Sequence, residues 1–218
     1  KAQSDRLNST VVIHVAETRK ERDDILAQFG KTPASYLASI GFLSDRTIAA
    51  HSVWLRPDEV DLYKSYGVGS AHCPTSNMKL ASGIAPIPEM IAKDVAVGLG
   101  TDGAASNNDL DMWEEMDLAA KLHKVSTNDP KTLPAETAFE MATIRGARAL
   151  HLDKITGSLE AGKRADIAIV DLDSLNQMPW FNIYSSLVYS TKAADVRTVV
   201  IEGRIVMLDR RLLTLNEN

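Results

Sequence analysis

The stretch VAVGLGTDGAASNNDLDM, residues 95–112, combines a short apolar run, one acidic residue near its end and a polar loop of small residues. The apolar run at 95–100 predicts a buried strand, and Asp102 follows it almost directly. A strongly amphipathic helix is expected over 109–124, with Asp109 near its N-terminal cap. The loop is too polar and its residues are too small for a core position, so this strand–loop–helix unit is a candidate functional site.

The same alternation of strand and helix precedes this unit along the chain. Buried strands are predicted at 11–16, 47–51 and 68–73. The predicted helices lie at 17–30, 32–41, 56–67 and 87–93, with one or two more within 133–150, whereas 74–86 is expected to be a loop. Successive strand–helix units imply a parallel sheet with right-handed crossovers.

A polar side chain stands at or near the end of each of these strands, at His14, His51, His72 and Asp102. Ligand-type residues at successive carboxyl ends of strands are typical of the mouth of a TIM barrel, where active sites lie. An open doubly wound sheet is the alternative fold, but it more often carries a glycine-rich phosphate turn, and the sequence contains no GxGxxG. A whole barrel needs eight strands and about 250 residues. We therefore expect an α/β fold that contains the second, C-terminal half of a TIM-like (β/α)8 barrel.

The C-terminal part of the chain changes character. A strand is predicted at 167–171, and two more within 196–213 around a turn at Glu202–Gly203. These strands predict part of a small β-sandwich domain beside the barrel. We accordingly divide the chain into residues 1–155, the second half of a metal-dependent hydrolase barrel, and residues 156–218, the C-terminal part of a composite β domain.

The composition excludes several classes of partner. The chain has 218 residues, 44% hydrophobic and 24% charged, and a net charge of −5, which argues against a nucleic-acid partner. No apolar run is long enough to span a membrane. The single cysteine, Cys73, permits no internal disulfide and favours a reducing compartment, so we expect a cytoplasmic protein. The chain lacks an initiator Met, and half a barrel leaves two sheet edges open. We therefore expect these edges to be covered by the rest of a longer polypeptide or by a second copy, as in a homo-oligomer.

The strand ends indicate a divalent metal site. Imidazole nitrogens and carboxylate oxygens suit Zn²⁺, and Fe²⁺ or Mn²⁺ accept the same ligands. His14 and Asp102 are the predicted ligands, because barrel curvature brings their strand ends together. An H-x-H pair could complete such a site, but none of the five histidines are two residues apart. His72 is expected mainly to shape its loop, His123 and His151 to be solvated, and Cys73 to be a small buried residue.

Several segments carry a family resemblance. HVAE (14–17), AAHSVWL (49–55), HCPTSNMKLASGIAP (72–86) and GTDGAASNNDLDM (100–112) resemble the amidohydrolase superfamily. The last two together are similar to the 5-methylthioadenosine/S-adenosylhomocysteine deaminases. GSLEAGKRADIAIVD (157–171) matches the return of the superfamily to its β domain. The resemblance covers nearly the whole chain, and it implies a hydrolase that converts an adenosine derivative to the inosine-type product and ammonia.

The resemblance also implies roles for individual residues. His14 would be a metal ligand, and Asp102 would be a metal ligand, a substrate contact and the general base. Glu17 would bind the adenine ring and carry a proton to a ring nitrogen, and His51 would hydrogen-bond the attacking hydroxide beside the substrate. Ser106 belongs to the loop that would contact the purine nucleoside.

Two alternatives stay open on sequence grounds. Relatives that act on guanine-type or triazine substrates share parts of the loop at 72–86, so another amino- or chloro-heterocycle is a possible substrate. The missing H-x-H pair would also suit a non-catalytic fragment.

Overall fold

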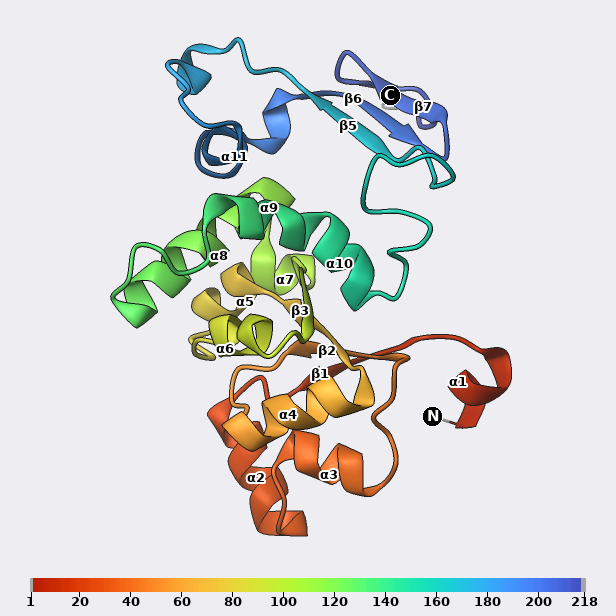
Figure 1. Cartoon of the computed structure of the whole chain (residues 1–218), viewed down its shortest axis with the longest axis vertical. Coiled ribbons are helices and arrows are strands. Elements are labelled where there is room, and N and C mark those ends of the chain that lie inside the picture. The colour runs from red at the N-terminus through yellow and green to blue at the C-terminus, as the bar shows by residue number, and fades with distance from the viewer. Residues whose placement is uncertain (1, 217–218) are drawn as a thin grey trace.

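The structure of the chain is a computed structural model, and it describes residues 2–216 (Figure 1). Its first sheet consists of β1 (Val11–Val15), β2 (Thr47–His51), β3 (Gly69–His72) and β4 (Ala96–Leu99). All neighbouring pairs are parallel, and the strands lie in chain order. A doubly wound sheet reverses its strand order at a switch point, whereas a barrel sheet does not. The four predicted strands are therefore confirmed, and their order is that of a barrel segment.

Helices follow the strands where the sequence predicted them: α2 (Arg19–Phe29), α3 (Pro33–Ser39), α4 (Pro57–Tyr66), α6 (Ile87–Ala92) and α8 (Met112–Thr127). Local signals explain their ends. Thr18 caps α2 by accepting a hydrogen bond from the backbone N–H of Glu21, and Gly30 ends this helix in the left-handed conformation. The apolar faces of these helices bury a common core against the sheet, which includes Val15, Ala49, Val60, Tyr63, Met90 and Val97.

Three helices within residues 2–155 were not predicted. These are α1 (Ala2–Leu7), α5 (Pro74–Lys79) and α7 (Ala104–Asn107), of which α5 occupies part of the predicted loop at 74–86. Helix α5 has the mostly polar sequence PTSNMK and α7 has only four residues, so neither shows a helical apolar period, which explains the wrong loop prediction. The N-cap of α8 is Asp111 rather than Asp109, because Asn108 and Leu110 have positive φ and keep the chain out of a helix there.

The segment 133–150 forms two helices, α9 (Ala135–Ala142) and α10 (Ile144–Ala149). Helix α10 lies directly on β3 and β4 at positions that lack a side chain. A Cβ on Gly69 would lie 1.9 Å from the carbonyl oxygen of Ala149, and one on Gly98 would lie 2.7 Å from Cα of Gly146. Glycine at these two strand positions is what permits the close approach.

The second sheet is antiparallel and has the order β5 (Ile167–Val170), β6 (Val196–Ile201), β7 (Arg204–Leu208) and β8 (Arg211–Leu212). The β6–β7 turn places both Glu202 and Gly203 at positive φ, as a two-residue hairpin requires. Between β5 and β6 the chain forms the short helical segments η1 (Leu175–Gln177), α11 (Ile183–Ser185), η2 (Ser186–Ser190) and η3 (Ala193–Asp195). In Figure 1 this sheet lies beyond α9, at the opposite end of the molecule from α2 and α3. No helix within residues 2–216 is long and apolar enough to cross a membrane.

Candidate active site

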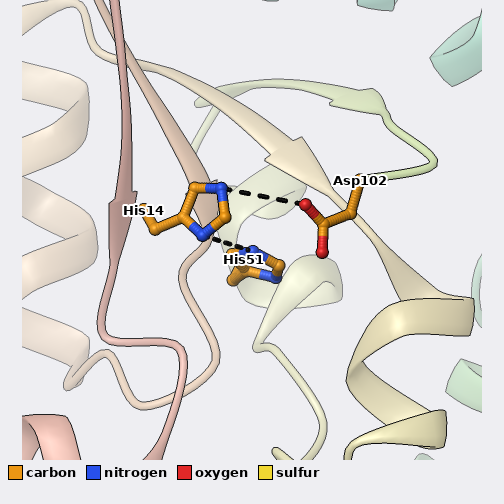
Figure 2. A group of neighbouring side chains, drawn as sticks. All are labelled: His14, His51 and Asp102. Carbon is orange, nitrogen blue, oxygen red and sulfur yellow. Dashed lines mark hydrogen bonds and ion pairs between the residues drawn. The ribbon is translucent and has the colours of Figure 1, made fainter. Parts of the chain in front are cut away.

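Three ligand-type side chains meet at the carboxyl edge of the parallel sheet (Figure 2). His14 comes from β1, His51 from the end of β2, and Asp102 from the loop after β4. Nε2 of His51 lies 3.2 Å from Nδ1 of His14, and Nε2 of His14 lies 3.8 Å from Oδ1 of Asp102. One donor atom from each of the three residues lies within 4.8 Å of the others. Segments that are far apart in the sequence thus place two imidazoles and a carboxylate around one point.

The backbone at the strand ends directs these side chains. In the β1–β2 register His14 pairs with Ala50 and Val15 pairs with His51, so simple alternation would put His51 on the side of Val15, away from His14. His51 instead has a φ of 67°, and this left-handed conformation accompanies the turn of its ring toward His14. Asp102 also lies in the left-handed region, with a φ of 59°.

The His51 ring is completely buried and held in one orientation. Its Nδ1 lies 2.9 Å from Oδ1 of Asn77, in α5. An amide oxygen accepts hydrogen bonds, so Nδ1 is the donor of this pair and Nε2 is the ring nitrogen that faces His14. Asn77 therefore selects the tautomer whose free nitrogen faces His14.

The two oxygens of Asp102 have different surroundings. Oδ2 accepts hydrogen bonds from the hydroxyls of Ser76, at 2.8 Å, and Ser106, at 2.5 Å, whereas Oδ1 faces His14. Partial burial works to raise the pKa of Asp102, but the hydrogen bonds from Ser106 and Ser76 outweigh it and hold the pKa below its usual value. The carboxylate is therefore ionised at neutral pH. The Ser106 hydroxyl, predicted to contact substrate, is engaged by Asp102 and by the carbonyl oxygen of Gly103.

Glu17 lies beside the two histidines. Its Oε2 is 3.5 Å from Nδ1 of His14 and 3.7 Å from Nε2 of His51. The turn that carries it is held by Glu21, whose carboxylate accepts the backbone N–H groups of Ala16, at 2.8 Å, and Glu17, at 2.7 Å. The first turn of α2 thereby fixes the backbone position of Glu17.

His72 does not join this group. Its Nε2 lies 3.2 Å from Nε2 of His123 on α8, and both rings are buried. Burial lowers the pKa of His72 well below its ordinary value and lowers that of His123 to about 4. The prediction that His123 is solvated is wrong, because it lies on the buried face of α8 that also contains Met116, Ala119 and Ala120. The predictions of an exposed His151 and a buried Cys73 are confirmed.

Four supporting residues were not predicted from the sequence: Ser76, Asn77, Glu21 and Glu115. Ser76 and Asn77 lie in α5, which was expected to be a loop. Glu21 carried a readable signal, since it stands three residues after Thr18 as in a capping box. Glu115 carried none, because a glutamate in an amphipathic helix usually indicates its solvated face.

Comparison with known families places the chain among metal-dependent hydrolases with this barrel architecture. A model of the Amidohydrolase family matches residues 1–206. The chain belongs to the amidohydrolase family.

Among its relatives are two curated deaminases. The chain is 50% identical over 215 residues to a 5-methylthioadenosine/S-adenosylhomocysteine deaminase of Syntrophomonas wolfei, which covers 98% of this chain and 50% of the relative. It is 46% identical to a 5'-deoxyadenosine deaminase of Methanosphaera stadtmanae, over 100% of this chain and 51% of the relative. The chain therefore spans about half the length of the curated relatives it matches.

Two solved structures extend the comparison. An adenosine deaminase from Xanthomonas campestris, solved with bound zinc, superposes with a TM-score of 0.96 at 40% identity, covering 99% of this chain and 49% of that one. The atrazine chlorohydrolase of Arthrobacter aurescens, solved with zinc, gives a TM-score of 0.91 at 27% identity, covering 99% and 48%. Both alignments show that the fold is one half of an amidohydrolase barrel enzyme.

Proposed function

We propose that this chain supplies one half of a hydrolytic deaminase for adenosine derivatives. The substrate would be 5-methylthioadenosine, S-adenosylhomocysteine or adenosine, and the products would be the inosine-type compound and ammonia. The observation that carries the proposal is the convergence of His14, His51 and Asp102 within 4.8 Å, with Glu17 beside them. This constellation occurs in a chain that is 50% identical to a protein named as such a deaminase.

The donor set fits one divalent metal ion. Two imidazoles and an ionised carboxylate are the ligands that Zn²⁺ prefers among nitrogen and oxygen donors, and Fe²⁺ and Mn²⁺ tolerate them. We propose zinc, held by His14 and Asp102 with His51 adjacent. When bound, the ion would supply a Lewis acid that lowers the pKa of a water molecule from about 16 to about 7.

The residues of the chain would then divide the proton transfers between them. Water adds to the purine carbon that carries the amino group, and Asp102 takes one of its protons. The buried Nε2 of His51 accepts a hydrogen bond that orients the attacking oxygen. Glu17, in its protonated form, gives its proton to the adjacent ring nitrogen. Asp102 returns its proton to the amino group, which leaves as ammonia, while the second water proton passes from the hydroxyl group to the Glu17 carboxylate as the carbonyl forms. General acid–base help of this kind contributes roughly 10²–10⁴-fold in rate.

The presence of one parallel and one antiparallel sheet supports a division of the chain into two parts. We propose that residues 1–155 form the second half of the hydrolase barrel and that residues 156–218 form the C-terminal part of a composite β domain. The remaining metal ligands and the cover for the open sheet edge would come from the rest of a longer polypeptide or from a second copy. We further propose a cytoplasmic location and a small purine nucleoside as substrate.

A second candidate function is hydrolysis of another heterocycle. It is compatible with the fold, because an atrazine chlorohydrolase superposes with a TM-score of 0.91, but the 27% identity is below the 40% shared with the adenosine deaminase. A substrate panel separates the two functions, with the full-length protein assayed on adenosine derivatives, guanine and chlorotriazines. Loss of the adenosine absorbance at about 265 nm and release of ammonia are expected, and both should be abolished by Asp102→Asn because an amide cannot accept the proton. Turnover of a triazine alone would refute the deaminase proposal.

A further inference from the structure

A carboxylate behind the candidate active site joins the two helices that hold Asp102. Glu115 lies in the first turn of α8 and is completely buried. Its Oε1 accepts a hydrogen bond from Nδ2 of Asn107, at 2.6 Å, and its Oε2 accepts one from the backbone N–H of Thr75, at 3.2 Å. One side chain of α8 thus binds α7 through Asn107 and the first turn of α5 through Thr75.

The residues next to these two contacts reach the site. Ser106 precedes Asn107 on α7, and Ser76 follows Thr75 on α5. Their hydroxyls are the two donors to Oδ2 of Asp102. Because each seryl donor is one residue from a group bound to Glu115, the carboxylate sets the relative position of the two donors.

The orientation of Asn107 in this chain of contacts is fixed. Its Oδ1 accepts a hydrogen bond from the backbone N–H of Leu110, at 2.7 Å, so its Nδ2 must point toward Glu115. Asn107 is itself buried, and within residues 2–216 its Nδ2 donates to Glu115 and to no other side chain. This geometry requires an acceptor opposite Nδ2, and Oε1 of Glu115 supplies it.

The burial of Glu115 argues for a role beyond packing. A buried carboxylate loses its hydration, and an apolar side chain of similar size fills space without that loss. Burial accordingly raises the pKa of Glu115 above its ordinary value. A buried carboxylate offsets this cost when its two oxygens accept hydrogen bonds from two separate donors. Glu115 does so with Asn107 and Thr75.

We propose that Glu115 is a positioning residue for Asp102: by clamping α5 and α7 it aims Ser76 and Ser106 at Oδ2 and so leaves Oδ1 alone to face the metal site. The proposal rests on the proposed function in that it takes Asp102 as a metal ligand. Supporting contacts of this kind typically contribute 10–100-fold to metal affinity.

The test compares zinc affinities of the full-length protein, measured by competition with a chromophoric chelator. Glu115→Gln keeps the volume, but one amide oxygen can accept from only one of the two donors. We expect zinc binding to weaken about 10-fold. The matched control is Asp117→Asn on the same helix, which makes the same carboxylate-to-amide change at a residue that pairs with the surface Lys121. Its zinc affinity should equal that of the wild type.

A double-mutant cycle separates positioning from general stability. In the background of Ser76→Ala with Ser106→Ala, Glu115→Gln should have no further effect on zinc affinity, because the path to Asp102 is already broken. Wild-type affinity in Glu115→Gln, or full additivity with the serine substitutions, would overturn the proposal. A crystal structure of Glu115→Gln that keeps both seryl hydrogen bonds to Asp102 would also overturn it, whether or not zinc binds. Zinc binding with the expected cycle but without turnover of any adenosine derivative would instead refute only the proposed function.

Discussion

The buried pair of His72 and His123 makes the stability of the fold depend on pH. Burial, with a smaller contribution from the Lys124 ammonium, lowers the pKa of His123 from 6.5 to about 4. Between these two values the unfolded chain binds a proton that the folded chain does not, so stability decreases as the pH is lowered. With 1.36 kcal/mol for each pKa unit, this one residue removes about 3 kcal/mol by pH 4 and about 2 kcal/mol by pH 5.

The perturbation that tests this reasoning is His123→Gln, because the glutamine amide does not titrate. The free energy of unfolding in urea is measured at about pH 8 and about pH 5 for the wild type and the variant. We expect the variant to be less stable at pH 8, since it loses ring packing, but its loss on acidification should be smaller than that of the wild type by about 2 kcal/mol. His151→Gln, at an exposed position, is the control and should follow the wild type. Equal losses in His123→Gln and the wild type would refute the reasoning.

Three further predictions concern other buried groups. Glu59→Gln should lower stability by about 1–3 kcal/mol in urea unfolding, because Glu59 accepts hydrogen bonds from Thr32, from Ser35 and from the backbone N–H of Arg56; an unchanged midpoint would contradict this. Burial raises the pKa of Cys73 to about 12, so its thiol should react with a disulfide reagent at least about 100-fold faster after unfolding than before, and rapid native labelling would show that it is accessible. In thermal melts, Gly69→Ala should lower the free energy of unfolding by about 3 kcal/mol or more, since its Cβ would lie 1.9 Å from a backbone oxygen. Gly103→Ala should be close to neutral, because nothing lies within 4 Å of its Cβ.

The sheet and the central residues of the site could be predicted because their signals are local. Each strand is a short apolar run, and the carboxyl ends of parallel strands meet at one edge whatever the details of packing. His14, His51 and Asp102 were therefore expected near one another, and the structure brings them within 4.8 Å. The same reasoning did not assign His72, whose ring turns to α8 instead.

The supporting residues could not be predicted because their partners are distant in the chain. Glu115 binds Thr75 across 40 positions, and His123 meets His72 across 51. A polar residue on an amphipathic helix usually indicates the face toward water. Only the contacts of Glu115 with Thr75 on α5 and of His123 with His72 on β3 show that these two face inward. The tautomer of His51 likewise depends on Asn77, in a helix whose mostly polar sequence shows no apolar period.

The residues with left-handed backbone at the strand ends affect how the carboxyl edge of the sheet can change in evolution. Successive side chains of a strand point to opposite faces of the sheet, so inserting one residue moves every later side chain to the other face. Ala16, His51 and Asp102, with φ of 51°, 67° and 59°, interrupt that alternation at the last position or just beyond the pairing, at a conformational cost of about 1–3 kcal/mol each. The aim of a reactive group is thereby decoupled from the hydrogen-bond ladder beneath it. Substitutions at a few loop positions can therefore change the chemistry of the site, while the strands of the barrel keep their register.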